Sequence, residues 1–539
     1  MGDTMTASGA SGWLLPAMLL WPLLAAVIVR VLGRDVSADG TSSGIDARVL
    51  TLLALAVEAA MGIAVWVMFR PGQQVWQFAV NWPWIPDIGA GFTLGADGLS
   101  VPMLVMTALL MPLTLLGSWN NVKVRTPTYG ALVLALTAGL VGVFVATDLL
   151  LFYVAWELML VPTYFIVGIW GGIDRRQAVL KYVLMTMIGS LLMLVAIIAL
   201  WSMGGSTSFA LDHLRTVQMS DAAQLWMFGA FFLAFAVKSG LVPFHSWMPD
   251  AQQTAPTLGA VTLGIKVGMY AMLRFAIPMF PMAAVNPTVS RIIAIVSVVA
   301  IIYGALVAMA QTDLKRLISY SSISHLGFIM LGCFVLSPAS VQGAMWITVN
   351  HGVTTSALFL LAGMLQDRRG TNVMTAFGGL ARVVPLFSIM LTLAMLSTVG
   401  LPGTNGFIGE FLVLIGSYST WPGLTTIATG AVVLAAVYGL RALQQVLFGP
   451  LDLASNGTMR DLSGRELSVM TVFAAAIIGF GVSPAGVLQR IESGTIRLQR
   501  ALPVGVVSGR LTVRLANDAA VAESTAVVAA LPTVSSFAH

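Results

Sequence analysis

The chain has 539 residues, of which 58% are hydrophobic and only 9% are charged. About a quarter of the residues of a soluble protein are charged, and the 27 basic and 22 acidic side chains here are too few to cover several water-facing domains. These figures exclude a soluble enzyme. The net charge of +5 comes from short basic clusters between apolar runs. Such clusters are typical of loops beside lipid headgroups, so nucleic-acid binding is excluded as well.

Fourteen apolar runs are long enough to cross a membrane, since a spanning helix needs about 20 apolar residues. The runs are continuously apolar and do not alternate, which favours helices over a β-barrel. The sequence therefore predicts an all-α, polytopic membrane protein. The runs are residues 13–32, 48–69, 99–117, 127–146, 148–169, 177–201, 222–243, 257–277, 288–310, 314–335, 341–365, 382–419, 423–447 and 468–490.

The cysteine content and the absence of certain motifs limit the chemistry that this chain can perform. Cys333 is the single cysteine, which permits no intrachain disulfide and no cysteine-ligated iron–sulfur cluster or zinc site. The sequence has no phosphate-binding glycine loop, nucleophile elbow or HExxH motif. We expect no cofactor and no metal in this chain, so any redox centre belongs to another subunit.

Lysine and arginine are distributed unevenly between alternate loops. Four lie in the even-numbered loops and sixteen in the odd-numbered loops. Cytoplasmic loops carry the excess of basic residues, so the odd loops are predicted to be cytoplasmic and both termini to face outward. Trp76, Trp82 and Trp84 are expected to be interfacial anchors on the outer side. The four are Arg70, Arg215, Arg274 and Arg291; the sixteen are Arg30, Arg34, Arg48, Lys123, Arg125, Arg175, Arg176, Lys181, Lys315, Arg316, Arg368, Arg369, Arg382, Arg441, Arg460 and Arg465.

Two features indicate an internal repeat. Thr-Asp-Leu opens the fifth run at residues 147–149 and the tenth at 312–314, and glycine and proline interrupt the seventh run at 238–243 and the twelfth at 400–403. An odd number of helices separates the copies, which predicts two inverted five-helix repeats with broken helices 7 and 12. The expected segments are 1–120 with helices 1–3, 127–277 with the first repeat, 288–447 with the second, 468–490 with helix 14, and 491–539 as a C-terminal tail on the periplasmic side.

Ionisable residues inside the runs are the strongest functional signal. Glu157 lies about 14 Å into its helix, near the middle of the hydrocarbon core, and Lys266 lies equally deep in helix 8. Only five of the 27 basic residues are lysine, yet both basic residues deep in the runs, Lys238 and Lys266, are lysines. A buried lysine can exchange its proton, whereas arginine stays charged. The alternative is a static ion pair between Glu157 and Lys238.

The second half of the chain adds two histidines and a carboxylate. His325 and His351 lie mid-span, where imidazole can accept and release protons near neutral pH; alternatively each is a hydrogen-bonded core residue. Glu410 follows the break in helix 12, and its alternative role is a cap on the dipole of the following half-helix. Asp148 and Asp313 are expected either to cap helix starts or to contact lipid headgroups.

Several motifs together resemble the antiporter-like subunits of respiratory complex I and the related Mrp-type cation/proton antiporters. The resemblance covers roughly residues 95 to 450. Glu410 is at a position where the L and N subunits and the antiporters usually have lysine and subunit M has glutamate, so the chain looks like the M type of bacterial NADH-quinone oxidoreductase. The motifs are Phe152-Tyr153-Val154-Ala155-Trp156-Glu157-Leu158 with Pro162, Lys238 through Ala251, Lys266, and Tyr320-Ser321-Ser322-Ile323-Ser324-His325.

The resemblance implies a proton channel in the membrane arm, coupled to electron transfer from NADH to quinone in other subunits. The implied relay is the ion pair Glu157–Lys238, then Lys266, then His325 and His351, and finally Glu410. It also implies L-type and N-type neighbours in a bacterial inner membrane, with FMN, iron–sulfur clusters and quinone in partner subunits. Two alternatives stay open: a subunit of an Mrp-type sodium/proton antiporter, and a structural membrane scaffold without a proton path.

Overall fold

The computed structural model describes residues 11–35, 44–73 and 76–502. Within these residues, thirteen helical segments are long and apolar enough to cross a membrane. This confirms the predicted all-α, multi-pass fold. The segments are α1 (Leu14–Leu32), α2 (Ala47–Met68), α3 (Ser100–Gly117), α4 (Thr126–Val145), α5 with α6 (Leu149–Leu158, Leu160–Trp170), α7 (Arg175–Met203), α9 (Asp221–Ser239), α11 to α13 (Thr257–Met279), α15 (Pro287–Ala310), α16 (Leu314–Val335), α17 (Pro338–Arg369), α20 (Pro422–Leu443, extended to Phe448) and α22 (Gly464–Val482).

Two shorter helices, α18 (Pro385–Thr398) and α19 (Asn405–Tyr418), lie where the sequence predicts the twelfth span. They correspond to the broken twelfth helix that the sequence predicts. Between them Gly400 and Gly403 have φ of +83° and +92°, a backbone conformation that glycine adopts without strain. The other predicted break is present too: α9 ends at Ser239, Gly240 has φ +74°, and the chain continues into α10 (Trp247–Thr254).

A third break was not predicted. The segment Thr257–Met279 is divided into α11 (Thr257–Gly264), α12 (Val267–Ala271), a π-helical turn at Met272–Ala276 and α13 (Ile277–Met279). Lys266 is in the non-helical step between α11 and α12. A side chain at Gly268 would clash with Ser239, so α12 approaches the end of α9 closely. Two of the three breaks therefore lie beside each other.

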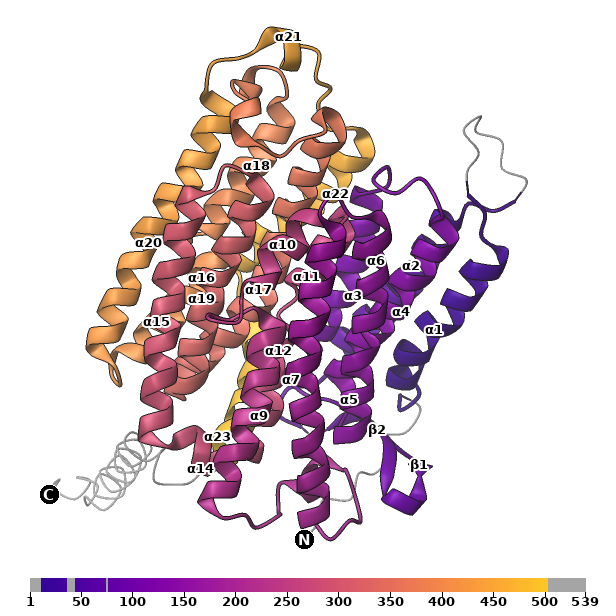
Figure 1. The fold of residues 1–539 in the computed structure, drawn as a ribbon, viewed down its shortest axis with the longest axis vertical. Helices are drawn as coiled ribbons and strands as arrows, with labels where there is room; N and C mark the ends of the chain where they lie inside the picture. Colours follow the sequence, from indigo (N-terminus) through magenta and orange to yellow (C-terminus); the bar gives the residue numbers. More distant parts are fainter. Residues whose placement is uncertain (1–10, 36–43, 74–75, 503–539) are drawn as a thin grey trace, which may run out of the picture.

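The spans that carry Lys266, His325 and His351 are the most buried. Nearly all of α16, α17 and Thr257–Met279 is enclosed, whereas most residues of α2, α20 and α22 are not. Figure 1 shows α12 and α17 near the middle of the bundle, α1 and α2 at one edge, and α20 at the opposite edge. The outer helices expose apolar side chains, as expected for surfaces that face lipid or other subunits.

The two Thr-Asp-Leu segments share one local geometry. Asp148 accepts hydrogen bonds from the first amides of α5, and Asp313 does the same for α16, so both are helix caps as predicted. Each segment also forms a short antiparallel bridge with a later loop: Leu149 N donates to Phe209 O and Leu314 N to Asn372 O, both at 2.9 Å. This likeness supports the inverted repeat, which stays a prediction.

One face of the bundle carries a β-hairpin that the sequence analysis did not predict. Strands β1 (Gln77–Ile85) and β2 (Ala90–Ala96) pair antiparallel, joined by a 3₁₀ turn at Pro86–Ile88. Trp82 stacks on Phe92 at 5.6 Å, and both Trp82 and Trp84 are exposed. The expectation of an exposed anchor at Trp76 is wrong, because Trp76 is buried. The remaining short helices are α8 (Leu211–Leu214), α14 (Pro281–Val285), α21 (Leu453–Asn456) and 3₁₀ turns at Met374–Ala376 and Leu380–Arg382.

The segment predicted as one helix over 468–490 is two helices. The first, α22, ends at Val482, and the second, α23 (Ala485–Arg500), begins after Ser483 and Pro484. Proline cannot donate its amide to a continuing helix, which explains the break. The buried side chains of α23 include Ile491 and Leu498, which pack it against α3 and α17. The predicted tail 491–539 thus begins within an amphipathic helix, and its residues 503–539 lie outside the described residues.

Candidate proton relay

Lys266 is the starting point of a chain of polar contacts in the middle of the bundle. Its side chain is 1% exposed, and its Nζ donates to Ser322 Oγ at 2.7 Å. Because Lys266 lies in the break between α11 and α12, its backbone is free of the regular helix ladder. Ser322 lies on α16, so this bond joins two of the most enclosed spans.

Ser322 connects Lys266 to the first histidine. Its Oγ is 2.7 Å from His351 Nε2, and Thr355 Oγ1, one helical turn along α17, is 2.9 Å from the same nitrogen. A hydroxyl can accept one proton and donate another. Ser322 therefore accepts from the Lys266 ammonium and has its own proton available for His351, which is the arrangement a proton relay needs.

The two histidines and Glu410 complete the chain. The rings of His325 and His351 lie 4.8 Å apart, centroid to centroid, at 45°. His325 Nδ1 is 2.8 Å from Glu410 Oε1, and both side chains are buried. The structure thus brings together four of the six predicted residues: Lys266, His351, His325 and Glu410. Among these described side chains, the hydrogen-bonded chain is interrupted once, between the two imidazole rings.

A small polar cavity lies beside this step. It holds about 20 Å³, which is room for a water molecule. The side chains of His325, His351 and Glu410 line it. A water there can bridge imidazole nitrogens that do not touch directly.

The wall of this cavity is built around the break between α18 and α19. Asn405 Oδ1 accepts from Ser397 Oγ at 2.6 Å and from Thr354 Oγ1 at 3.2 Å, and Asn405 Nδ2 donates to Asn350 Oδ1 at 3.0 Å. All four side chains are buried and line the cavity. The break therefore exposes polar groups to the relay and not to lipid.

Glu410 does not act as a helix cap. It is the sixth residue of α19, the start of α19 has no side-chain cap, and the carboxylate is paired with His325 instead. A side chain at Gly400 would come within 3.0 Å of Glu410 Oε2, so the glycine break lies directly against the carboxylate. Among the alternatives, the structure favours the relay position over the dipole cap.

Lys238 lies in a different environment. Its Nζ donates to the hydroxyl of Tyr182 at 2.9 Å, and the ammonium is 5.3 Å from the Tyr182 ring and 5.7 Å from the Trp156 ring. Aromatic faces and a phenol oxygen thus hold the charge. No hydrogen bond or ion pair joins Lys238 to Lys266 among the described residues.

The expected direct ion pair between Glu157 and Lys238 is absent from the ion pairs of the described residues, so that expectation is wrong for this conformation. The reason is the geometry of α5. Trp156 is buried and faces Lys238, and the next residue of a helix points about 100° away. Glu157 is accordingly only half-buried, on the flank of α5 that leads to the bundle surface.

The comparisons with known proteins agree with this architecture. Residues 146–435 match the family model for the transmembrane region of NADH:quinone oxidoreductase and Mrp antiporter subunits. A Rhodobacter capsulatus protein named NADH-quinone oxidoreductase subunit M is 38% identical over 501 residues, covering 90% of this chain and 96% of the relative. The chain belongs to the NADH:quinone oxidoreductase/Mrp antiporter family. It is a multi-pass membrane protein of the antiporter-like fold.

Solved structures of this family superpose well. A chain of respiratory complex I from Thermus thermophilus with bound NADH matches with a TM-score of 0.82 and 31% identity, covering 91% of this chain and all of the other. A chain of the Mrp complex from Dietzia sp. DQ12-45-1b matches with a TM-score of 0.75 and 21% identity, over 97% of this chain and 60% of the other. The second likeness shows the fold alone. Both structures are multi-subunit membrane complexes, and members of the family work as subunits of such assemblies.

Within this family fold, sequence reasoning missed the groups that connect the ionisable residues. Ser322 and Thr355 contact His351, and Tyr182 holds Lys238. The sequence does contain a sign of these residues, because a hydroxyl side chain in an otherwise apolar span must find a hydrogen-bond partner. What the spans do not reveal is which hydroxyls face an ionisable group, because that depends on packing between helices far apart in the sequence.

Proposed function

We propose that this chain is the M-type proton-translocating subunit in the membrane arm of an NADH-quinone oxidoreductase. The observation that carries the proposal is the contact chain Lys266–Ser322–His351, followed by His325–Glu410, in the enclosed centre of the family fold. A scaffold gains nothing from buried amines and imidazoles, which cost free energy on insertion into a membrane.

The proposed proton path follows these contacts. Lys266 passes a proton to His351 through the Ser322 hydroxyl. The proton crosses the 4.8 Å between the imidazole rings through the polar cavity and reaches Glu410 from His325. Imidazole suits the middle of such a path because it can bind and release protons near neutral pH.

Lys238 and Glu157 are proposed to drive the path. In this conformation Tyr182 holds the Lys238 ammonium, while Glu157 lies on a half-exposed flank of α5. A neighbouring subunit that changes charge beside this flank can draw Glu157 toward Lys238 or away from it. The ammonium is stabilised with Glu157 near and destabilised without it, which sets whether Lys238 gives up its proton toward Lys266.

The family assignment supports further proposals about context. We place L-type and N-type antiporter-like subunits on either side of this chain, and FMN, iron–sulfur clusters and quinone in other subunits. The basic residues of the odd loops support an orientation with both termini outside, and the bacterial relatives named subunit M support a bacterial inner membrane.

Co-purification and vesicle assays test the assignment. Purification of the chain in mild detergent should yield flavin and iron–sulfur subunits, and inside-out vesicles should acidify on NADH oxidation in a manner that depends on this chain. The alternative, an Mrp-type antiporter, predicts proton movement driven by an imposed sodium gradient without NADH. Sodium-driven exchange together with no flavoprotein partner would overturn the proposal in favour of the antiporter.

A further inference from the structure

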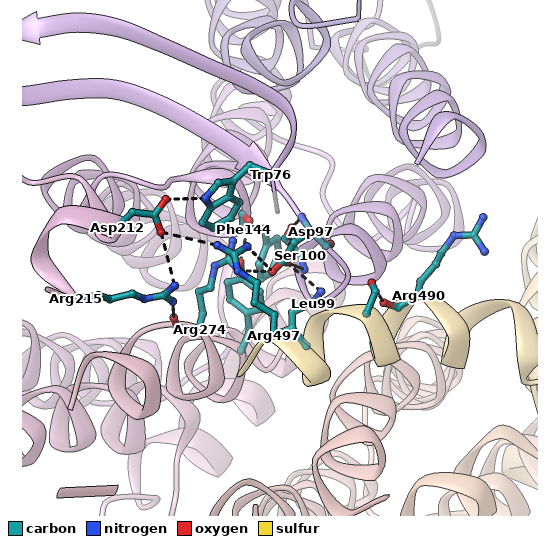
Figure 2. A network of polar contacts seen from close by, with 12 residues as sticks. Trp76, Asp97, Leu99, Ser100, Phe144, Asp212, Arg215, Arg274, Arg490 and Arg497 are labelled. Carbon is teal, nitrogen blue, oxygen red and sulfur yellow. Dashed lines mark hydrogen bonds and ion pairs between the residues drawn. The ribbon is translucent and has the colours of Figure 1, made fainter. Parts of the chain in front are cut away.

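A second cluster of charged residues, which shares no residue with the relay, lies on the face of the bundle that carries the hairpin and α23. We call it the arginine cluster, and Figure 2 shows its members converging from four separate segments. Asp97 precedes α3, Asp212 is in α8, and Arg215 directly follows α8. Arg274 is in the π-helical turn of the eighth span, and Arg497 is on α23.

The cluster has more positive than negative groups. Asp97 forms an ion pair with Arg274 and lies 3.7 Å from Arg497 Nη1. Asp212 lies 3.8 Å from both Arg215 and Arg497. Within the cluster, three guanidinium groups thus share two carboxylates. The sequence analysis had assigned Arg274 to a loop, whereas it is 3% exposed.

Trp76 fixes the guanidinium groups in place. The guanidinium carbon of Arg274 is 4.1 Å from the indole centroid and that of Arg497 is 4.2 Å from it, while the indole N–H donates to Asp212 at 3.0 Å. Stacking of this kind holds a guanidinium plane without using its hydrogen-bond donors. Both guanidinium planes are therefore held in place before a ligand arrives.

Some of these donors are buried without a partner among the described residues. Arg274 bonds Asp97 through Nη1, but its Nε and Nη2 have no acceptor. Arg215 Nη2 donates to the Arg274 carbonyl at 3.3 Å, and its Nε has no acceptor. Buried polar groups are nearly always hydrogen-bonded in native proteins, so unused donors of charged groups indicate that an acceptor belongs there.

These arginines line one cavity. Three arginines (Arg215, Arg274 and Arg497) and one carboxylate (Asp97) form its charged wall, and Leu99, Leu273 and Leu498 are among its apolar lining. Asp212 beside it is 52% exposed, so the cluster reaches the surface of the chain. The amphipathic helix α23 borders it, and such helices lie at the boundary of headgroups and acyl chains.

We propose that the arginine cluster binds a phosphate oxyanion, either the phosphate of an anionic phospholipid headgroup or free inorganic phosphate. Phosphate oxygens accept several charge-assisted hydrogen bonds at once, and the planar fork of arginine matches them. The anion would accept hydrogen bonds from the unused donors of Arg215 and Arg274. The apolar part of the lining suits the glycerol end of a lipid.

The electrostatics of the cluster fit this proposal. Burial, and then the like charges of Arg274 and Arg497, lower the pKa of Arg215 to about 9. Burial raises the pKa of Asp97, but Arg274 and Arg497 outweigh it, so the pKa is lowered and the carboxylate stays ionised. The positive groups repel one another even with both aspartates charged, and an added anion relieves this repulsion.

Native mass spectrometry of the purified whole assembly tests the site. The assembly is stripped of lipid and then titrated with phosphatidylglycerol, with phosphatidylcholine or with inorganic phosphate, and anions retained on the released chain are counted. Arg215→Gln removes an unused donor, and Arg215→Lys keeps the charge without the fork. The control is Arg490→Gln, because Arg490 is on α23 like Arg497 of the cluster, stacks on Trp66 at 3.9 Å and, in Figure 2, points away from the cluster.

Wild type and Arg490→Gln should retain phosphatidylglycerol alike, whereas Arg215→Gln should bind it about tenfold more weakly and Arg215→Lys should fall between. If the variants rank in this order for inorganic phosphate but no protein retains phosphatidylglycerol, free phosphate is the ligand. If Arg215→Gln assembles normally and retains both anions as wild type does, or if wild type retains neither, the cluster is a purely structural set of ion pairs and the proposal is overturned. If Arg215→Gln fails to assemble, Arg215→Lys is compared with wild type in its place, and equal retention of both anions by these two proteins overturns the proposal.

Discussion

The two halves of the predicted relay differ in how they are connected. From Lys266 to Glu410, buried side chains contact one another in sequence, with one short step between imidazole rings. At the other end, Lys238 is held by Tyr182, and Glu157 faces away from it on a half-exposed flank. From this contrast we infer that the connected half conducts protons, whereas the Glu157 half responds to a charge change outside the chain.

The largest effect is expected at the end of the connected half. Glu410→Gln keeps an acceptor for His325 but cannot take up a proton, so translocation through this chain should fall by about a hundredfold or more. The measurement is protons moved per NADH oxidised in proteoliposomes of the assembled complex. Normal pumping by this variant would mean that Glu410 has only a structural role.

Glu157 tests the switched half. Glu157→Ala should abolish pumping through this chain, and Glu157→Asp should largely retain it, since only the charge matters if the side chain acts at a distance on Lys238. The assay is proton uptake during NADH oxidation, with assembly checked by size-exclusion chromatography. Unimpaired pumping in the alanine variant would remove the difference between the halves.

Ser322 provides a sharper probe of continuity. Ser322→Ala leaves Lys266 and His351 in place but deletes the hydroxyl between them, and we expect the proton-transfer rate to fall about tenfold. Ser324→Ala is the matched control, because Ser324 is buried on the same helix and bonds a backbone carbonyl, Ile301 O, at 2.8 Å. Equal rates in the two variants would show that the path bypasses Ser322.

The smallest effect on pumping is expected outside both halves, at Asp97. Its pKa is lowered in the folded chain despite burial, because Arg274 and Arg497 favour the ionised form. The stabilisation is present above the ordinary pKa of about 3.9 and is lost as the pH falls through the lower folded value. Asp97→Asn should lose about 3 kcal/mol of stability near neutral pH and release α23 to trypsin, without changing protons per NADH. A changed proton ratio would link this region to the relay.

Sequence alone supplied the elements but not the contacts. The continuous apolar runs predicted the spans, and the glycines and prolines at 238–243 and 400–403 predicted two of the breaks. The break at Lys266 escaped prediction because it has no proline, only Gly264 and Gly268 on either side. The hairpin escaped because burial does not alternate along its strands: β1 has four buried residues followed by five exposed ones, so the period of two that marks a strand is missing.

For the candidate site, the sequence predicted which residues take part but not which of them contact one another. Amines, imidazoles and carboxylates deep in apolar runs can be recognised as candidate functional groups, because inserting them into a membrane costs free energy. Whether Lys238 meets Glu157 or Tyr182 depends on the rotation of α5 and α7 about their axes, since a shift of one residue turns a side chain by about 100°. The pairing of Lys238 with Tyr182 is therefore visible only in the folded chain.

Two buried lysines allow the most direct test of the central claim that protons pass through the connected half. Lys266 and Lys315 are each 1% exposed, but Lys315 bonds Gln366 Oε1 at 2.6 Å near the start of α16, away from the histidines. Protons per NADH should fall in Lys266→Ala and stay at the wild-type value in Lys315→Ala. Equal, normal values in both variants would contradict the account and favour a structural scaffold.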